Sequence, residues 1–131
     1  MAVLNKNQRN KIESLLEQRC NTLREEIADE LEASGEQHYI DLAGAVADVG
    51  DASVADMLTD LGAAIVDRQI NELRQIEAAR ARMGEDAFGL CIQCGIEIGY
   101  QRLCASPTAQ RCFECQSVHE KTYSHENNPA L

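Results

Sequence analysis

Apolar side chains recur at steps of three and four residues through the first part of the chain, which is the spacing of one helical face. The positions are Ile12, Leu16, Cys20, Leu23, Ile27 and Leu31. Asn5 followed by Gln8 resembles a capping box, which predicts that the helix begins there. Beyond Leu31 the apolar face continues less cleanly, and Gly35 and Gly44 weaken that stretch without forbidding a helix.

A second helical pattern follows and ends near Gly84. Its apolar positions are Val54, Met57, Leu58, Leu61, Ile65, Leu73 and Ile76. Between the two patterns, the string from Asp48 to Ser53 has Gly50 at its centre and is typical of a turn. Neither segment contains proline, so we expect an antiparallel hairpin of two helices, each with about 30 residues and about 45 Å long.

The expected fold is mainly α: a long antiparallel two-helix coiled-coil hairpin with a small C4 zinc-finger module and a C-terminal helix. Residues 1–10 form a short N-terminal segment, residues 11–84 form the hairpin with an acidic tip near 48–53, and residues 85–131 form the zinc finger and the last helix. Aromatic residues are scarce, with three Tyr, two Phe and no Trp, which favours an elongated helical shape over a compact globule.

Two C-x-x-C pairs, Cys91 with Cys94 and Cys112 with Cys115, are separated by seventeen residues. Each pair can form a knuckle that directs two thiolates at one ion, and two knuckles complete a tetrahedron. Gly95 suits the tight turn that a knuckle requires. Four thiolates leave no open coordination position, so we predict one structural zinc ion.

The remaining candidate ligands receive less specific predictions. Cys20 lies in the first apolar seam and is expected in the core, whereas Cys104 lies in the zinc loop and is the expected reactive thiol. His119 and His125 are expected at the surface of the C-terminal helix. No nucleophile–base pairing, phosphate loop or histidine–carboxylate metal motif is present, which indicates a non-catalytic protein.

The net charge of −10 argues against docking on the phosphates of DNA or on an anionic membrane. No apolar run approaches the roughly 20 residues of a membrane span, so we expect a cytosolic protein with reduced thiols. The spacing of the knuckles also occurs in GATA-type DNA-binding fingers. Residues 85–131, however, carry three Lys and Arg against six Asp and Glu, which disfavours DNA binding.

Charge is segregated along the hairpin. Residues 25–67 contain twelve Asp and Glu and neither Lys nor Arg. Folding the chain about Gly50 is expected to gather the flanking basic residues at the open end and the acidic residues toward the turn. Acidic helix surfaces commonly aid solubility, but segregation over 43 positions also suits an electrically polarised rod.

The residues around the cysteines resemble the DksA/TraR family of bacterial transcription regulators. The resemblance rests on Phe88-Gly-Leu-Cys91-Ile-Gln-Cys94-Gly95, Ile98-Gly99, Arg102-Leu103, Ala105, Pro107-Thr108 and Cys112-Phe-Glu-Cys115. The preceding hairpin is similar in size and order, so the resemblance covers nearly the whole chain.

This resemblance implies a cytoplasmic bacterial protein that binds RNA polymerase at its secondary channel and rim. Family members insert the coiled-coil tip toward the catalytic magnesium and change the stability of promoter complexes, often with ppGpp. The tip motif maps onto Asp48, Asp51 and Ser53, and Arg68 and Arg102 are candidate polymerase contacts at the base of the hairpin.

Two departures from the family pattern change these expectations. Ser53 stands where the family has alanine, and together with Asp56 it also fits an N-capping box, as Asp51 could. We therefore favour a functional role for Asp48 and a shared one for Asp51.

Neutral side chains stand where ppGpp-responsive members tend to be basic, which predicts weak or absent dependence on ppGpp. These positions are Gln75, Ser106 and Gln116. The main alternative is a zinc-ribbon adaptor that pairs with another helical protein through seam residues such as Leu23 and Leu61. A DNA-binding finger ranks third, and an enzyme last.

Overall fold

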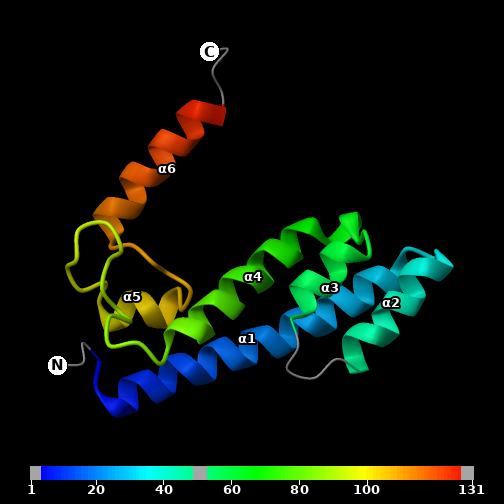
Figure 1. The fold of residues 1–131 in the computed structure, drawn as a ribbon, viewed down its shortest axis with the longest axis horizontal. Coiled ribbons are helices and arrows are strands. Elements are labelled where there is room, and N and C mark those ends of the chain that lie inside the picture. The colour runs from blue at the N-terminus through cyan, green and yellow to red at the C-terminus, as the bar shows by residue number, and fades with distance from the viewer. Residues whose placement is uncertain (1–3, 49–52, 128–131) are drawn as a thin grey trace.

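The computed structural model describes residues 4–48 and 53–127, which are mainly helical (Figure 1). The elements are α1 (Lys6–Ala33), α2 (Gln37–Asp48), α3 (Val54–Asp60), the 3-10 turn η1 (Ala64–Val66), α4 (Asp67–Arg82), α5 (Tyr100–Ala105) and α6 (Phe113–Asn127). The mainly α fold class is confirmed.

The first helix begins as the sequence predicts. The Asn5 side-chain oxygen accepts from the Gln8 backbone N–H at 2.8 Å, and the Gln8 side-chain oxygen accepts from the Asn5 N–H at 3.0 Å. This reciprocal pair satisfies two amides that the helix itself leaves unbonded. All six predicted seam residues of α1 are buried, and Cys20, which is 7% exposed, is a core residue as expected.

Each arm of the expected hairpin is interrupted by a glycine. α1 ends at Ala33, and Gly35 follows in the left-handed region with φ +75°. α3 ends at Asp60, and Gly62 follows with φ +74°. A glycine just past a helix end takes this conformation without the cost that a Cβ would add, so both positions terminate a helix. The expectation of two continuous helices therefore differs from the structure at these two points.

These breaks turn α2 and α3 back toward the zinc module. α2 runs back along α1, and α3 packs against α4 (Figure 1). We call the end formed by residues 34–36 and 61–63 the distal end, and the opposite end, where α1 begins and α4 meets the zinc module, the base. The His38 Nε2 atom lies 3.1 Å from the Leu61 carbonyl oxygen and joins the two distal turns.

One continuous core fills the space between these helices. The fully buried side chains include Ile12, Leu16, Leu23, Ile27, Leu31, Val46, Leu58, Val66, Leu73, Ile76 and Leu103. Two residues of the predicted second seam are not in this core, because the chain turns at Gly62: Leu61 is 46% exposed and Ile65 is 43% exposed. Within the described residues, no helix is both long and apolar enough to cross a membrane.

Candidate metal centre and hairpin motif

The four predicted zinc ligands converge at the base. The sulfur atoms of Cys91, Cys94, Cys112 and Cys115 all lie within 4.8 Å of one another. The Sγ atoms of Cys94 and Cys112 are 3.7 Å apart. Four sulfurs at about 2.3 Å from one tetrahedral zinc ion would lie about 3.8 Å apart, so the donor set fits this ion.

Backbone amides of both knuckles point at the sulfurs. The Gln93 N–H donates to Cys91 Sγ at 3.4 Å, and the Cys115 N–H donates to Cys112 Sγ at 3.5 Å. Gly95, with φ +78°, closes the first knuckle by donating to the Cys91 carbonyl at 3.0 Å. These bonds orient the thiolates before the metal binds, as outer-shell contacts do in zinc sites.

The thiol pKa values diverge within this cluster. Burial alone raises the pKa of Cys91, but backbone N–H groups outweigh this and lower its pKa to about 6. The hydrogen bond with Cys112, with further contributions from Cys94 and from burial, raises the pKa of Cys115 to about 12. Four sulfurs this close cannot all ionise unaided, whereas a bound zinc ion keeps all four as thiolates.

The zinc module is attached to the start and end of the hairpin. The Arg9 guanidinium donates to the carbonyl oxygens of Met83 and Glu85, and it lies over the Phe88 ring at 5.9 Å from the centroid. α5 packs against α1, and its Leu103 side chain is fully buried. The module therefore fixes the base, while α6 projects away from it (Figure 1).

Of the three predicted tip residues, Asp48 and Ser53 lie within the described residues, and neither is at the distal end. Asp48 is exposed at the last position of α2, alongside the middle of α1, where Arg24 Nη2 donates to the Val46 carbonyl at 2.9 Å. Ser53 precedes α3, and Asp51 lies outside the described residues. The distal end is instead formed by the two glycine turns.

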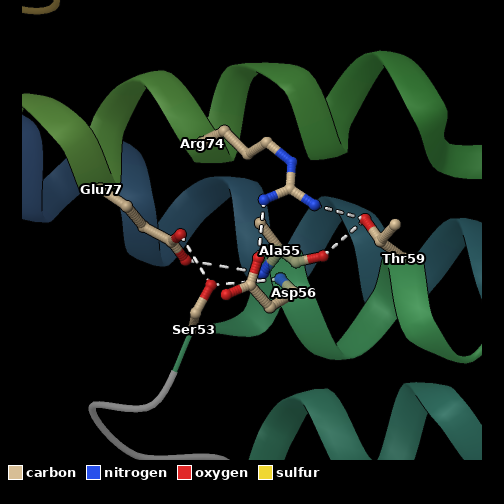
Figure 2. A network of polar contacts seen from close by, with 6 residues as sticks. All are labelled: Ser53, Ala55, Asp56, Thr59, Arg74 and Glu77. Atoms are coloured by element: carbon tan, nitrogen blue, oxygen red, sulfur yellow. Dashed lines mark hydrogen bonds and ion pairs between the residues drawn. The ribbon is translucent and has the colours of Figure 1, made fainter.

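Ser53 has the capping role that the sequence predicts and a second contact that it does not reveal. Its Oγ accepts from the Asp56 N–H at 3.1 Å, which caps α3. The same hydroxyl donates to Glu77 Oε2 on α4 at 2.8 Å (Figure 2). Arg74 on the same face of α4 donates to Asp56 at 2.7 Å. Sequence reasoning missed Glu77 and Arg74 because their partners are set only by the packing of α3 on α4.

Arg68 and Arg102 lie far apart. Arg102 is at the base, on α5, where its Nε donates to the Arg111 carbonyl at 3.2 Å. Arg68 is in the first turn of α4, toward the distal end, and is exposed. Fifteen residues of helical rise, about 22 Å, separate it from Met83 at the base. The expected gathering of basic residues at the base thus holds for Arg9 and not for Arg68.

The three neutral positions flagged in the sequence line one pocket. Gln75, Ser106 and Gln116 border a cavity of about 430 Å³ between α4, α5 and α6. Arg102 and Arg111 also line it. Gln75 lies on α4, Ser106 directly follows α5, and Gln116 lies on α6, so the fold brings three separate parts of the chain together at this pocket.

His119 and Cys104 are the two other side chains at the base for which the sequence made predictions. His119 lies on the wall of this pocket, partly buried, rather than on an open surface. Cys104 is half-buried on α5, outside the four-cysteine cluster, and its predicted reactivity stays a prediction.

Comparison with known proteins places these features in a family. Residues 87–121 match the prokaryotic dksA/traR C4-type zinc finger. The RNA polymerase-binding transcription factor DksA of Salmonella typhimurium is 30% identical over 117 residues, covering 89% of this chain and 74% of that protein. The chain belongs to the DksA/TraR family. The zinc fingers of this family are of the C4 type, so the cysteine cluster is a structural zinc site.

Other relatives agree with this family assignment. The DksA of Haemophilus influenzae is 43% identical over 54 residues, covering 41% of this chain and 37% of that protein. The structure of transcription factor DksA2 from Pseudomonas aeruginosa matches with a TM-score of 0.54 and 24% identity, covering 92% of this chain and 89% of that one. This likeness supports the fold.

Proposed function

We propose that this chain is a non-enzymatic transcription regulator that binds RNA polymerase. The observation that carries the proposal is the similarity to Salmonella DksA, an RNA polymerase-binding transcription factor, which extends over 89% of the chain and therefore includes the hairpin as well as the zinc module. The four-thiol site supports it, because a closed zinc site organises a binding surface and offers no open position for catalysis.

The hairpin motif is the proposed working part. Asp48 and Asp51, with Ser53 beside them, would act in the secondary channel of the polymerase near its catalytic magnesium. Asp48 is exposed, so its carboxylate is available for a partner. An anionic group on a narrow helical arm is attracted to a channel that holds cations or bound metal. Arg102 at the base is the better placed of the two arginines for a contact with the rim.

Binding and regulation should separate in the motif variants. We expect D48N/D51N to bind purified RNA polymerase with little change in affinity and to lose its effect on the lifetime of promoter complexes. The matched control is D29N/D41N, which removes two carboxylates from the same acidic stretch and should keep that effect. Failure of the wild-type protein to bind polymerase at physiological salt would refute the proposal.

We further propose a weak dependence on ppGpp. The pocket that contains Gln75 and Gln116 keeps two guanidinium groups, from Arg102 and Arg111, but Glu120 also lines it. Neutral amides give a polyphosphate hydrogen bonds without the charge that makes such bonds strong. Transcription in vitro with and without ppGpp tests this directly, and strong synergy with the wild-type protein would contradict it.

Lysines introduced into the pocket should change that response. We expect Q75K/Q116K to gain sensitivity to ppGpp, because both side chains line the same cavity. Q18K/Q101K adds the same charge at exposed positions that do not line this cavity and should stay insensitive. An equal gain in both variants would mean that net charge, and not the pocket, governs the response.

The adaptor alternative receives less support. It requires seam residues such as Leu23 to meet another helical protein, but Leu23 is 1% exposed inside the hairpin. Leu61, the other seam residue of this alternative, is 46% exposed at the distal turn, but most of the seam is already used within the chain, so we do not propose this function.

A further inference from the structure

The pairing of α1 with α4 has the register of a longer, uninterrupted hairpin. Arg9 contacts Met83, Arg19 pairs with Glu72, and Gln69 donates to Glu30. In a simple hairpin, the turn lies midway in sequence between two residues that pair across it. For Arg9 and Met83 this midpoint is position 46, and for Glu30 and Gln69 it lies between positions 49 and 50. A simple hairpin with this register would turn near Asp48, whereas the observed chain turns earlier, at residues 34–36 and 61–63.

Each of the two early turns contains a glycine in the left-handed conformation, and glycine can convert between left-handed and right-handed helical backbone at little cost. Gly35 and Gly62 have φ near +75°, and a Cβ built on either would meet nothing within 4 Å. Glycine populates right-handed helical and left-handed backbone with similar ease. Conversion of both glycines to helical backbone, together with Ala63 (ψ 61°) and Val66 (ψ 27°) at the second turn, would join α1 to α2 and α3 to α4 without moving the paired helices at the base.

The apolar residues of the folded-back helices can also serve a straight hairpin. Leu42 and Val46 of α2 are buried, as are Val54 and Leu58 of α3. Each pair is spaced four residues apart, so each forms a stripe on one helical face. In a straight hairpin these stripes would face each other, so part of the buried apolar area is retained in both arrangements.

Polar contacts between α3 and α4 are specific to the folded-back arrangement (Figure 2). Glu77 accepts from the Ser53 hydroxyl at 2.8 Å. Arg74 donates to Asp56 Oδ1 and to Thr59 Oγ1, both at 2.7 Å. A continuous α3–α4 helix would place these side chains about 15 to 24 residues apart along one axis, where they cannot meet.

We propose that α2 and α3 form a fold-back arm held by this latch, and that its release extends the hairpin. The latch consists of Arg74 and Glu77 on α4 with Ser53, Asp56 and Thr59 on the arm. In the closed form, Asp48 lies one α2 length, about 18 Å, behind the distal end. In the extended form it lies at the distal end, and the rod is longer by a similar amount.

The latch controls how far the Asp48 motif projects, so its regulatory role rests on the proposed function of that motif. A retracted motif cannot reach deeply into a narrow channel, whereas an extended one can. The closed form therefore corresponds to the resting protein, and the polymerase channel favours the extended form because only that form places Asp48 at the leading end.

A distance between α1 and α2 separates the two forms. Probes attached through non-natural amino acids at Lys11 and Gly44 would leave the cysteines and zinc intact, and both positions are exposed. Because α2 lies back along α1 in the closed form, the probes are about 25 Å apart there, against about 50 Å along one straight helix. Single-molecule energy transfer on the zinc-loaded full chain resolves these two populations.

Two pairs of substitutions form a matched comparison. R74A/E77A removes the latch and should increase the 50 Å population about five- to tenfold relative to the 25 Å population. R19A/E72A removes the same charges from a pair between α1 and α4 that both forms keep, and it should leave the ratio unchanged.

Glycine substitutions provide an independent second measurement. G35A/G62A disfavours left-handed backbone and favours helix at both turns, so the ratio should shift by about tenfold for each glycine. A wild-type protein already at 50 Å, an unchanged ratio in R74A/E77A, or equal shifts in R74A/E77A and R19A/E72A would overturn the proposal.

These distances are measured without polymerase, so they do not depend on the proposed function. If the latch variants extend and regulate transcription more strongly, both proposals stand. If they extend and never affect transcription, the latch stands and the proposed function fails.

Discussion

Removal of zinc should disorder the base and leave the helical hairpin folded. Between Phe88 and Cys112 the chain has one isolated bridge, Leu90 with Glu97, and the short helix α5. Its buried residues include Phe88 and Leu103, and we expect their burial to depend on the zinc ion holding the four thiolates together. Modules with so little regular structure are commonly unfolded without their metal.

The size of the spectroscopic change follows from the helix lengths. α5 has six residues and α6 has fifteen, which is 21 of the 84 residues in the six α-helices. Complete loss of both helices removes a quarter of the helical signal. The buried side chains of α1 to α4 are mostly Leu, Ile and Val, and the core cluster that they form also includes Cys91 and Cys112 at the base. Because most members of this core are not metal ligands, we expect the signal of the 63 residues of α1 to α4 to persist.

The assay is circular dichroism with hydrogen exchange, before and after chelation and in C112S. We expect one zinc ion per native chain, a fall in helical signal of at most about a quarter, and loss of amide protection confined to residues 88–115 and α6. Loss of most helical signal would show that the hairpin needs the zinc module to fold. Retention of full protection around Cys91 without metal would refute the structural role of the ion.

Three further predictions concern the stability of the hairpin. N5A should lower the free energy of unfolding by about 1 kcal/mol in urea titrations, because the capping box at the start of α1 is lost, and a change below about 0.3 kcal/mol would contradict this. L73A should lower the free energy of unfolding by about 2 to 5 kcal/mol, because Leu73 is fully buried. L61A, at the exposed distal turn, should lower it by less than about 1 kcal/mol. Similar losses in the two variants would mean that both leucines lie in one buried seam. The hydrogen bond from Arg19 lowers the pKa of Glu72, so the pair stabilises the protein above pH 4.5, and the stability difference between wild type and R19A should shrink as pH falls below that value rather than grow.

Local sequence signals predicted the metal site and the helix starts. The two C-x-x-C pairs identify the zinc ligands because knuckle geometry is determined by adjacent residues, and the structure brings all four sulfurs together. Asn5 and Ser53 both cap helices for the same reason: a cap requires only residues within one turn. The interactions that require only neighbours in sequence were therefore predictable.

Whether the chain turns at Gly35 and Gly62 or continues as helix depends on the free-energy difference between two packing arrangements. No local sequence pattern determines that difference. The apolar face weakens after Leu31, which signals a possible break, but glycine is also tolerated within a helix at a cost of about 1 kcal/mol. The outcome depends on whether α2 gains more by packing on α1 than by continuing it. That comparison involves residues from four helices. The contact between Ser53 and Glu77 could not be predicted for the same reason, because it depends on how α3 packs on α4.

Ser53 connects the departure from the family motif with the folded-back arm. The family resemblance implies alanine at this position, and a methyl group can neither cap α3 nor donate to Glu77. The serine hydroxyl does both, through Asp56 N–H and Glu77 Oε2. The cap is local and survives extension, whereas the bond to Glu77 exists only while α3 lies on α4. In the proposed fold-back, the serine would therefore stabilise the closed form selectively, and we expect its effect on regulation to arise from retaining the motif rather than from weaker contact with the polymerase.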